Sequence, residues 1–192
     1  MNAPPRFFIH RHIQFAMTDK QHFETAAIRG QMDRTGYREH SAPLFLTSSF
    51  TFPTAEEMEA TFAGEAEGII YSRYSNPNTD EFIAKLCALE GVEDGFATAS
   101  GMSAVFASMA AFLQAGDHLL ASRALFGSIF QILRQWLPRW GIEHTLVDPV
   151  AIDDWARHIR PNTRMIVLET PSNPGLALID LERAGALARA HG

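Results

Sequence analysis

The stretch Gly95-Phe96-Ala97-Thr98-Ala99-Ser100-Gly101-Met102-Ser103 decides the fold that we expect of this 192-residue chain. Its first half is a short apolar run that predicts a strand over 95–99, and its second half opens a helical period over 102–115. The same alternation continues along the chain, with strands expected near 118–122, 142–147 and 165–169 and helices near 127–139, 151–160 and 181–190. It predicts an α/β domain with a mostly parallel sheet and helices on its faces.

The Ser100-Gly101-Met102 turn lies where parallel sheets bind ligands, between the carboxyl end of a strand and the start of a helix. Gly101 lets the backbone approach an anion closely, the helix N-terminus favours negative charge, and Ser100 or Ser103 supplies a hydroxyl. A phosphate site is one interpretation of this turn. A purely structural turn is an equally good interpretation when the motif is taken alone.

A second motif runs from Tyr71 to Thr79. In an extended chain, residues two apart share a face, so Tyr71 and Arg73 are expected to offer a phenol and a guanidinium to the same anion. The Ser-Asn-Pro-Asn turn that follows fixes the direction of this pair, and Pro77 predicts the start of a helix that Gly91 closes. An aromatic-basic pair with no function beyond the surface is the alternative.

The third motif is Glu169-Thr170-Pro171-Ser172-Asn173-Pro174, directly after the strand expected at 165–169. Two prolines limit the backbone of Asn173, so its amide can be presented to a ligand oxygen at the carboxyl end of the strand. Glu169 could orient that amide or a neighbouring arginine. An ordinary proline-rich loop is the alternative interpretation.

In this order and spacing, the three motifs resemble the Cys/Met-metabolism family of pyridoxal-phosphate enzymes, from about Thr25 to Gly192. The resemblance implies the large domain of the PLP-dependent transferase fold of type I, the aspartate-aminotransferase-like fold, with pyridoxal 5'-phosphate as the cofactor. It implies phosphate-binding amides at Gly101 and Met102, an asparagine near the ring hydroxyl at Asn173, and an acid of the same site at Glu169. Ser100 and Phe126 complete the cofactor-binding residues that we expect within one subunit.

The resemblance also implies a homo-oligomer, formed of dimers that pair into tetramers. Tyr71 and Arg73 match residues that reach across a subunit interface to the cofactor phosphate of the neighbouring subunit. The family's members act on small amino-acid substrates.

Phe126 stands where the family's lyases and cystathionine synthases commonly carry a tyrosine. A phenylalanine ring stacks on a cofactor but cannot move a proton. This substitution, and the stretch from His40 to Phe50, resemble the branch that uses O-succinylhomoserine, or another O-acylhomoserine, and sulfide to form homocysteine in methionine biosynthesis. A cystathionine synthase or lyase is one alternative, and a non-catalytic remnant that binds phosphate or docks on a complete homologue is another.

The sequence has two lysines, Lys20 and Lys85, and neither matches the family lysine that holds the cofactor as a Schiff base. That lysine and the aspartate that pairs with the pyridine nitrogen lie further along the chain in the family. We therefore expect a front part that is inactive by itself and contains no catalytic residue. Its expected parts are a disordered leader (1–16), an N-terminal arm (17–75) and an incomplete cofactor-binding domain (76–192).

Composition excludes several other classes of protein. The chain has 16 basic and 22 acidic residues, a formal charge of −6, and no basic block, so no nucleic-acid partner is expected. No apolar run approaches the roughly twenty residues that span a bilayer, so we expect a cytoplasmic protein without a membrane partner. The single Cys87 excludes an internal disulfide framework and is expected to be a buried thiol. His10 and His12 are expected to lie in a solvated tail, without a metal.

Overall fold

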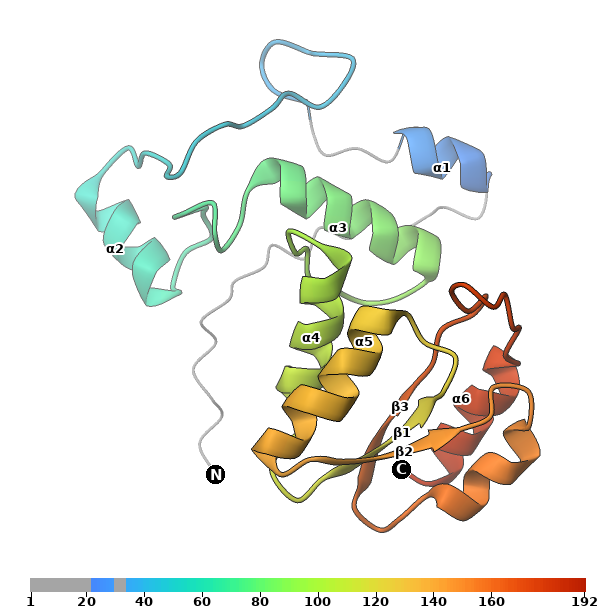
Figure 1. Ribbon diagram of the computed structural model, residues 1–192. Coiled ribbons are helices and arrows are strands. Elements are labelled where there is room, and N and C mark those ends of the chain that lie inside the picture. Colours follow the sequence, from blue (N-terminus) through green and yellow to red (C-terminus); the bar gives the residue numbers. More distant parts are fainter. Residues whose placement is uncertain (1–21, 30–33) are drawn as a thin grey trace. The chain divides into compact units, whose positions relative to one another are not determined.

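The structure, a computed structural model, describes residues 22–29 and 34–192. It forms two compact units, Met1–Ala97 and Thr98–Gly192. Figure 1 shows the elements of both. The expected leader, His10, His12 and Lys20 lie outside the described residues. Within the described ranges, no helix is long and apolar enough to cross a membrane.

In the described part of the first unit, the helices are α1 (Phe23–Arg29), α2 (Ala55–Ala63) and α3 (Pro77–Glu90). Helix α3 begins and ends as its sequence predicts. The Asn76 side chain caps it by accepting from the Asn78 amide at 3.0 Å, and Gly91 closes it in the left-handed region with φ 68°. Helix α2 has the same design, with Thr54 as its N-cap and Gly64 in the left-handed region.

The second unit is an α/β domain built on a parallel sheet of three strands in the order β2-β1-β3. In chain order its elements are α4 (Gly101–Phe112), β1 (His118–Ser122), α5 (Gly127–Gln131), η1 (Ile132–Trp136), η2 (Leu137–Trp140), β2 (Glu143–Val147), η3 (Ile152–His158), β3 (Thr163–Val167) and α6 (Leu181–Ala190). All five residues of the central strand β1 are buried. The predicted parallel sheet with flanking helices is confirmed, and the bounds of β1 and α6 agree with the sequence prediction.

Apolar side chains pack on both faces of this sheet. Leu119 and Ala121 of β1 point to one face, where they meet α4 and the α5-η1-η2 segment; Leu120 points to the other face, where it meets η3 and α6. Figure 1 shows α4 and α5 on one side of the strands and α6 with η3 on the other. The central strand therefore lies in the middle of a three-layer sandwich.

The strand predicted at 95–99 is wrong. Among the described residues, no segment forms a ladder with it, and Phe96 is 67% exposed. A strand needs a neighbour to accept and donate its backbone hydrogen bonds, so an apolar run alone does not make one.

Three other elements depart from their predicted form. Strand β3 begins at Thr163, two residues earlier than expected, because Thr163 pairs with His118. The helix predicted over 127–139 changes from α to π to 3-10 geometry and ends at Trp140, where Gly141 closes it in the left-handed region with φ 71°. The segment expected as a helix at 151–160 is the 3-10 helix η3.

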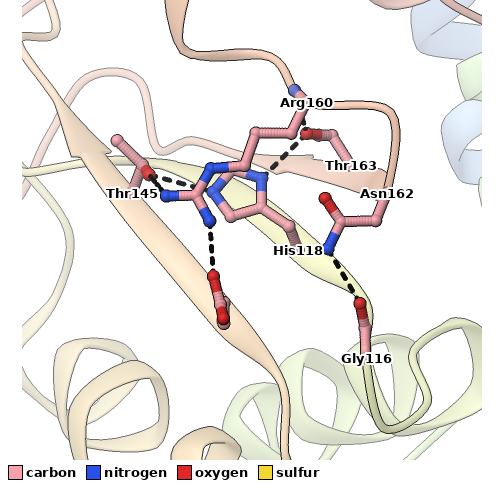
Figure 2. Close-up of polar contacts among 7 residues, drawn as sticks. Gly116, His118, Thr145, Arg160, Asn162 and Thr163 are labelled. Carbon is pink, nitrogen blue, oxygen red and sulfur yellow. Dashed lines mark hydrogen bonds and ion pairs between the residues drawn. The ribbon is translucent and has the colours of Figure 1, made fainter.

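The buried His118 ring joins the first residues of the sheet (Figure 2). Its Nδ1 lies 2.8 Å from Thr163 Oγ1 and its Nε2 lies 2.9 Å from Thr145 Oγ1, so the ring connects β1 to both neighbouring strands. Arg160 lies beside the ring, where it forms an ion pair with Glu143. Burial lowers the pKa of His118 below its ordinary value of 6.5, and the charge of Arg160 lowers this pKa further.

We expect the second unit to lose stability as the pH falls from 6.5. The unfolded His118 takes up a proton near its ordinary pKa of 6.5, whereas the folded ring does so only at a lower pH, so acid favours unfolding. His144 acts in the same direction, because burial and the nearby Arg134 lower its pKa. Urea unfolding at pH 7.5 and 5.5 measures the effect, and His118→Gln should weaken it. A His118 imidazole resonance that titrates at or above pH 6.5 would contradict the assignment.

Candidate functional site

The start of α4 offers free amide donors at the carboxyl end of the sheet. Helix α4 leads directly into the amino end of β1, and its twelve residues span about 18 Å, so its N-terminus lies at the opposite end. The amides of Gly101 and Met102 occupy its first two positions, where no intrahelical acceptor exists. Among the described residues nothing else accepts from them. These two donors are available to an anion.

The Ser100 side chain fixes the geometry of this turn. Its Oγ accepts from the Ser103 amide at 3.1 Å and lies 2.9 Å from Ser103 Oγ. Of the two hydroxyl hydrogens, one makes the mutual bond and one remains for a ligand. A Cβ added at Gly101 would meet no atom within 4 Å, so the space beside these amides is open. An anion with several oxygen atoms, such as a phosphate, fits this set of donors.

Phe126 is the N-cap residue of α5 and lies at the same end of the sheet. It lies four residues after the end of β1, its ring is partly exposed, and its own amide donates to Glu169 Oε2 at 2.7 Å. Glu169 follows β3 by two residues, so this bond joins the segments that leave two adjacent strands. The carboxylate thus contacts the Phe126 backbone rather than the Asn173 amide or an arginine.

The loop after β3 is closed by the buried Ser172. The Ser172 amide donates to the Ala177 carbonyl at 3.0 Å, and the Ala177 amide donates to Ser172 Oγ at 2.9 Å. Thr170 Oγ1 accepts from the Ile179 amide at 3.0 Å and closes the base of the loop. Asn173 is exposed, and within the described part of the chain its side-chain amide has no protein partner. The loop therefore leaves the Asn173 side-chain amide open to solvent.

Tyr71 and Arg73 lie in the first unit, in a turn rather than in an extended strand. Tyr71 forms a single antiparallel bridge with Ser49, and the Tyr74 amide then donates to the Tyr71 carbonyl at 2.9 Å. The prediction that Tyr71 and Arg73 share a face of a strand is wrong, because the turn hydrogen bond reverses the chain between them. The turn still brings them together, with the Arg73 guanidinium carbon 5.5 Å from the Tyr71 ring centroid.

Tyr74 is a residue of this cluster that the sequence analysis missed. The Arg73 guanidinium carbon lies 4.5 Å from the centroid of the Tyr74 ring, and Arg73 Nη2 donates to the Tyr74 hydroxyl at 3.2 Å. Both rings thus hold the guanidinium by cation–π contact. Its position in the sequence could have indicated this role, because a turn brings together residues three positions apart, such as Tyr71 and Tyr74.

Asn76 and Asn78 attach the arm to this turn. Asn76 Nδ2 donates to the Phe45 carbonyl at 3.1 Å, the Asn78 Oδ1 accepts from the Phe45 amide at 2.8 Å, and Asn78 Nδ2 donates to the Pro43 carbonyl at 2.7 Å. The Ser-Asn-Pro-Asn turn therefore does more than direct the chain, because its two amide side chains fix the segment around Phe45. Neither partner could be predicted from the residues around Asn76 and Asn78.

Lys85 lies on α3 and forms an ion pair with Glu81 at 3.4 Å. Of the two lysines in the sequence, Lys85 is the one within the described residues, and its i, i+4 pair with Glu81 is typical of a helix surface.

A cleft of about 680 Å³ opens at the amino end of the sheet, between Phe112, Asp117 and Arg164, opposite to the site at the carboxyl end. Among the described residues, no cluster of three histidine, cysteine or acidic side chains could hold a metal ion.

Comparison with known proteins identifies the class. The profile of the family described as "Cys/Met metabolism PLP-dependent enzyme" matches residues 24–192. The chain belongs to this family of pyridoxal-phosphate enzymes, as the three motifs indicated. The cofactor of the family is pyridoxal 5'-phosphate, which agrees with the donors of the Ser100-Gly101-Met102 turn.

The curated relatives narrow the comparison. An O-succinylhomoserine sulfhydrylase of Mycobacterium tuberculosis is 42% identical over 177 residues, which cover 92% of this chain and 44% of that protein. The sulfhydrylase of Pseudomonas aeruginosa is 42% identical over 173 residues, covering 88% of this chain and 42% of that protein. An L-methionine gamma-lyase of Porphyromonas gingivalis is 38% identical, covering 88% and 42%. The chain spans less than half the length of these relatives.

Solved structures show the same fold. A Campylobacter jejuni protein assigned as O-acetylhomoserine (thiol)-lyase superimposes with a TM-score of 0.81 at 31% identity, covering 88% of this chain and 42% of that one. That structure contains N'-pyridoxyl-lysine-5'-monophosphate. A cystathionine gamma-lyase of Lactobacillus plantarum superimposes with a TM-score of 0.78 at 30% identity, covering 89% and 42%.

Proposed function

We propose that this chain is the front part of an O-succinylhomoserine sulfhydrylase, which forms homocysteine from O-succinylhomoserine and sulfide in methionine biosynthesis. The observation that carries the proposal is Phe126, an aromatic ring without a hydroxyl just before α5, at the same end of the sheet as the open donors of α4. The 42% identity to two O-succinylhomoserine sulfhydrylases supports the same choice.

The residues of the second unit suit one end and one face of the cofactor. The Gly101 and Met102 amides and a hydroxyl of the Ser100-Ser103 pair would hold the phosphate, the Phe126 ring would stack on the pyridine, and Asn173 would donate to the ring oxygen. When bound, pyridoxal 5'-phosphate supplies an electron sink for bonds at the substrate's α-carbon. Phe126 would orient the pyridine ring but cannot donate or accept a proton, so other groups must transfer protons in the whole enzyme.

Lys85 cannot form the Schiff base with the cofactor that the family's lysine forms. Lys85 is on α3 of the first unit, its ammonium is paired with Glu81, and its sequence neighbours do not match the family's Ser-x-x-Lys segment. We propose that the 192-residue chain alone therefore has negligible activity. We further propose that the complete enzyme is a cytoplasmic homotetramer in which Tyr71 and Arg73 contribute to the phosphate site of a neighbouring subunit.

An assay of the complete protein tests this proposal. The gene is sequenced beyond the codon for Gly192, where we expect an aspartate and a Ser-x-x-Lys segment, and the complete reading frame is expressed. With O-succinylhomoserine as the first substrate, we expect homocysteine from sulfide to form at least ten times faster than cystathionine from cysteine. The 192-residue chain, assayed with the same cofactor and substrates, serves as the control and should give no turnover.

Other outcomes would favour the alternatives. Faster formation of cystathionine would indicate a cystathionine synthase. Cleavage of L-methionine without a second substrate would indicate a lyase, an alternative that the 38% identity to an L-methionine gamma-lyase supports. A stop codon directly after Gly192 would indicate a non-catalytic protein that binds phosphate or a complete homologue.

A further inference from the structure

We propose that Glu169 is a positioning residue that holds the Phe126 ring in place through the Phe126 backbone, and that it does not itself bind the cofactor. The inference rests on the proposed function, because it assigns Phe126 to a cofactor ring. Phe126 would contact the cofactor, and Glu169 would act only through Phe126.

The contact is a strong hydrogen bond between distant parts of the sequence. The Phe126 amide donates to Glu169 Oε2 at 2.7 Å across a separation of 43 residues, and an ionised acceptor makes such a bond shorter and stronger than a neutral pair. It crosses from the exit of β3 to the exit of β1, two strands that pair with each other. The sheet thus fixes both ends of the bond.

Phe126 needs this external acceptor because of its place in the chain. As the residue that precedes α5, it has non-helical backbone angles (φ −54°, ψ 138°), and its side chain makes no capping hydrogen bond. A phenylalanine cannot cap a helix, so its orientation is not fixed by the local polar contacts that serve Ser100 at the start of α4. The Glu169 carboxylate replaces them, and its negative charge also suits a helix N-terminus.

The ring that this bond holds is not fixed by packing alone. Phe126 is 42% exposed, whereas its neighbour Leu125 is 7% exposed and anchors the segment in the core. Without the Glu169 contact, the backbone at Phe126 can rotate about that anchor, and the ring would leave its stacking position. The Ser100-Gly101-Met102 turn is held by its own hydrogen bonds and should not change.

Amide exchange and ligand binding in the 192-residue chain test the inference together. The variants are Glu169→Ala, Glu169→Asp, whose carboxyl is one methylene too short, and Glu169→Gln, which keeps an acceptor oxygen at full length. Glu182→Ala, an exposed acid on α6, is the control. The probes are pyridoxamine 5'-phosphate, which cannot form a Schiff base with a lysine, and inorganic phosphate.

We expect the Phe126 amide to exchange at least tenfold faster in Glu169→Ala and Glu169→Asp, with Glu169→Gln and Glu182→Ala close to the unaltered chain. Affinity for pyridoxamine 5'-phosphate should fall about threefold to tenfold in the first two variants, while affinity for inorganic phosphate stays the same. A merely structural role would lower both affinities or neither.

Two results would overturn the inference. Unchanged Phe126 exchange in a folded Glu169→Asp variant would show that the bond does not hold the backbone. Unchanged exchange with weaker binding of both ligands would show that Glu169 binds the ligand directly. If the unaltered chain binds neither ligand, the proposed function fails and the positioning role fails with it, while the exchange rates still show whether the bond exists.

Discussion

Trp155→Ala is expected to reduce the free energy of unfolding of the second unit by about 3–5 kcal/mol. Trp155 lies on η3 with no exposed surface, and its side chain packs in the cluster that also contains Leu120, Val147 and Ile179. Its Nε1 donates to the Asp148 carbonyl at 2.7 Å. The substitution removes a large apolar side chain from a close-packed layer and leaves this carbonyl without its donor.

Guanidinium unfolding followed by far-ultraviolet circular dichroism measures this loss, since the change of tryptophan content complicates fluorescence. Domains are stable by about 5–15 kcal/mol, so the midpoint should move by a large fraction of its value. Trp155→Phe keeps an aromatic ring and should lose less, while Trp136→Ala removes a tryptophan that is 48% exposed and should change the midpoint little. Equal midpoints for Trp155→Ala and Trp136→Ala would contradict the packing described here.

Gly101→Asp is expected to weaken phosphate binding about tenfold without weakening the fold. A Cβ at Gly101 meets no atom within 4 Å, so the side chain is tolerated sterically. A carboxylate in the first turn of α4 favours the helix by about 0.3–1 kcal/mol. The same carboxylate occupies the side of the helix that faces a bound anion, so it repels the anion.

The expected size follows from Coulomb's law. Two unit charges about 5 Å apart in water interact by about 0.8 kcal/mol, and a phosphate carries about −1.5 to −2 charges, which together give about a tenfold loss. Titration of the 192-residue chain with pyridoxamine 5'-phosphate measures the affinity, and thermal melting measures the fold. Gly101→Asn has nearly the same shape without the charge and should lose much less affinity. Equal affinities for the two variants would mean that the anion does not bind beside Gly101.

Both variants test features that the sequence predicted to different degrees. The Ser100-Gly101-Met102 turn was predicted together with its role, because a serine cap, a glycine and an apolar helix are local signals. The burial of Trp155 was not predicted. Segment 151–160 reads as a helix, and the depth of its tryptophan depends on the strands that cover it.

The sequence alone determined the elements whose causes are local. Asn76, Pro77 and Gly91 set the limits of α3, because a cap, a fixed φ and a left-handed closure act within a few residues. The alternation of apolar strands and helical periods predicted the parallel sheet, and the run at 118–122 predicted β1 without error. These signals need no knowledge of what lies across the fold.

Only the tertiary structure decided the features that depend on a distant partner. The run at 95–99 has the composition of a strand but no neighbour to pair with in the described chain. Tyr71 and Arg73 meet through a turn that begins where Tyr71 pairs with Ser49. Glu169 accepts a hydrogen bond from the Phe126 amide, 43 residues away in the sequence. Hydrogen bonds of this kind form when the sheet and loops bring two segments together. Their partners are therefore set by the fold as a whole and not by the residues on either side.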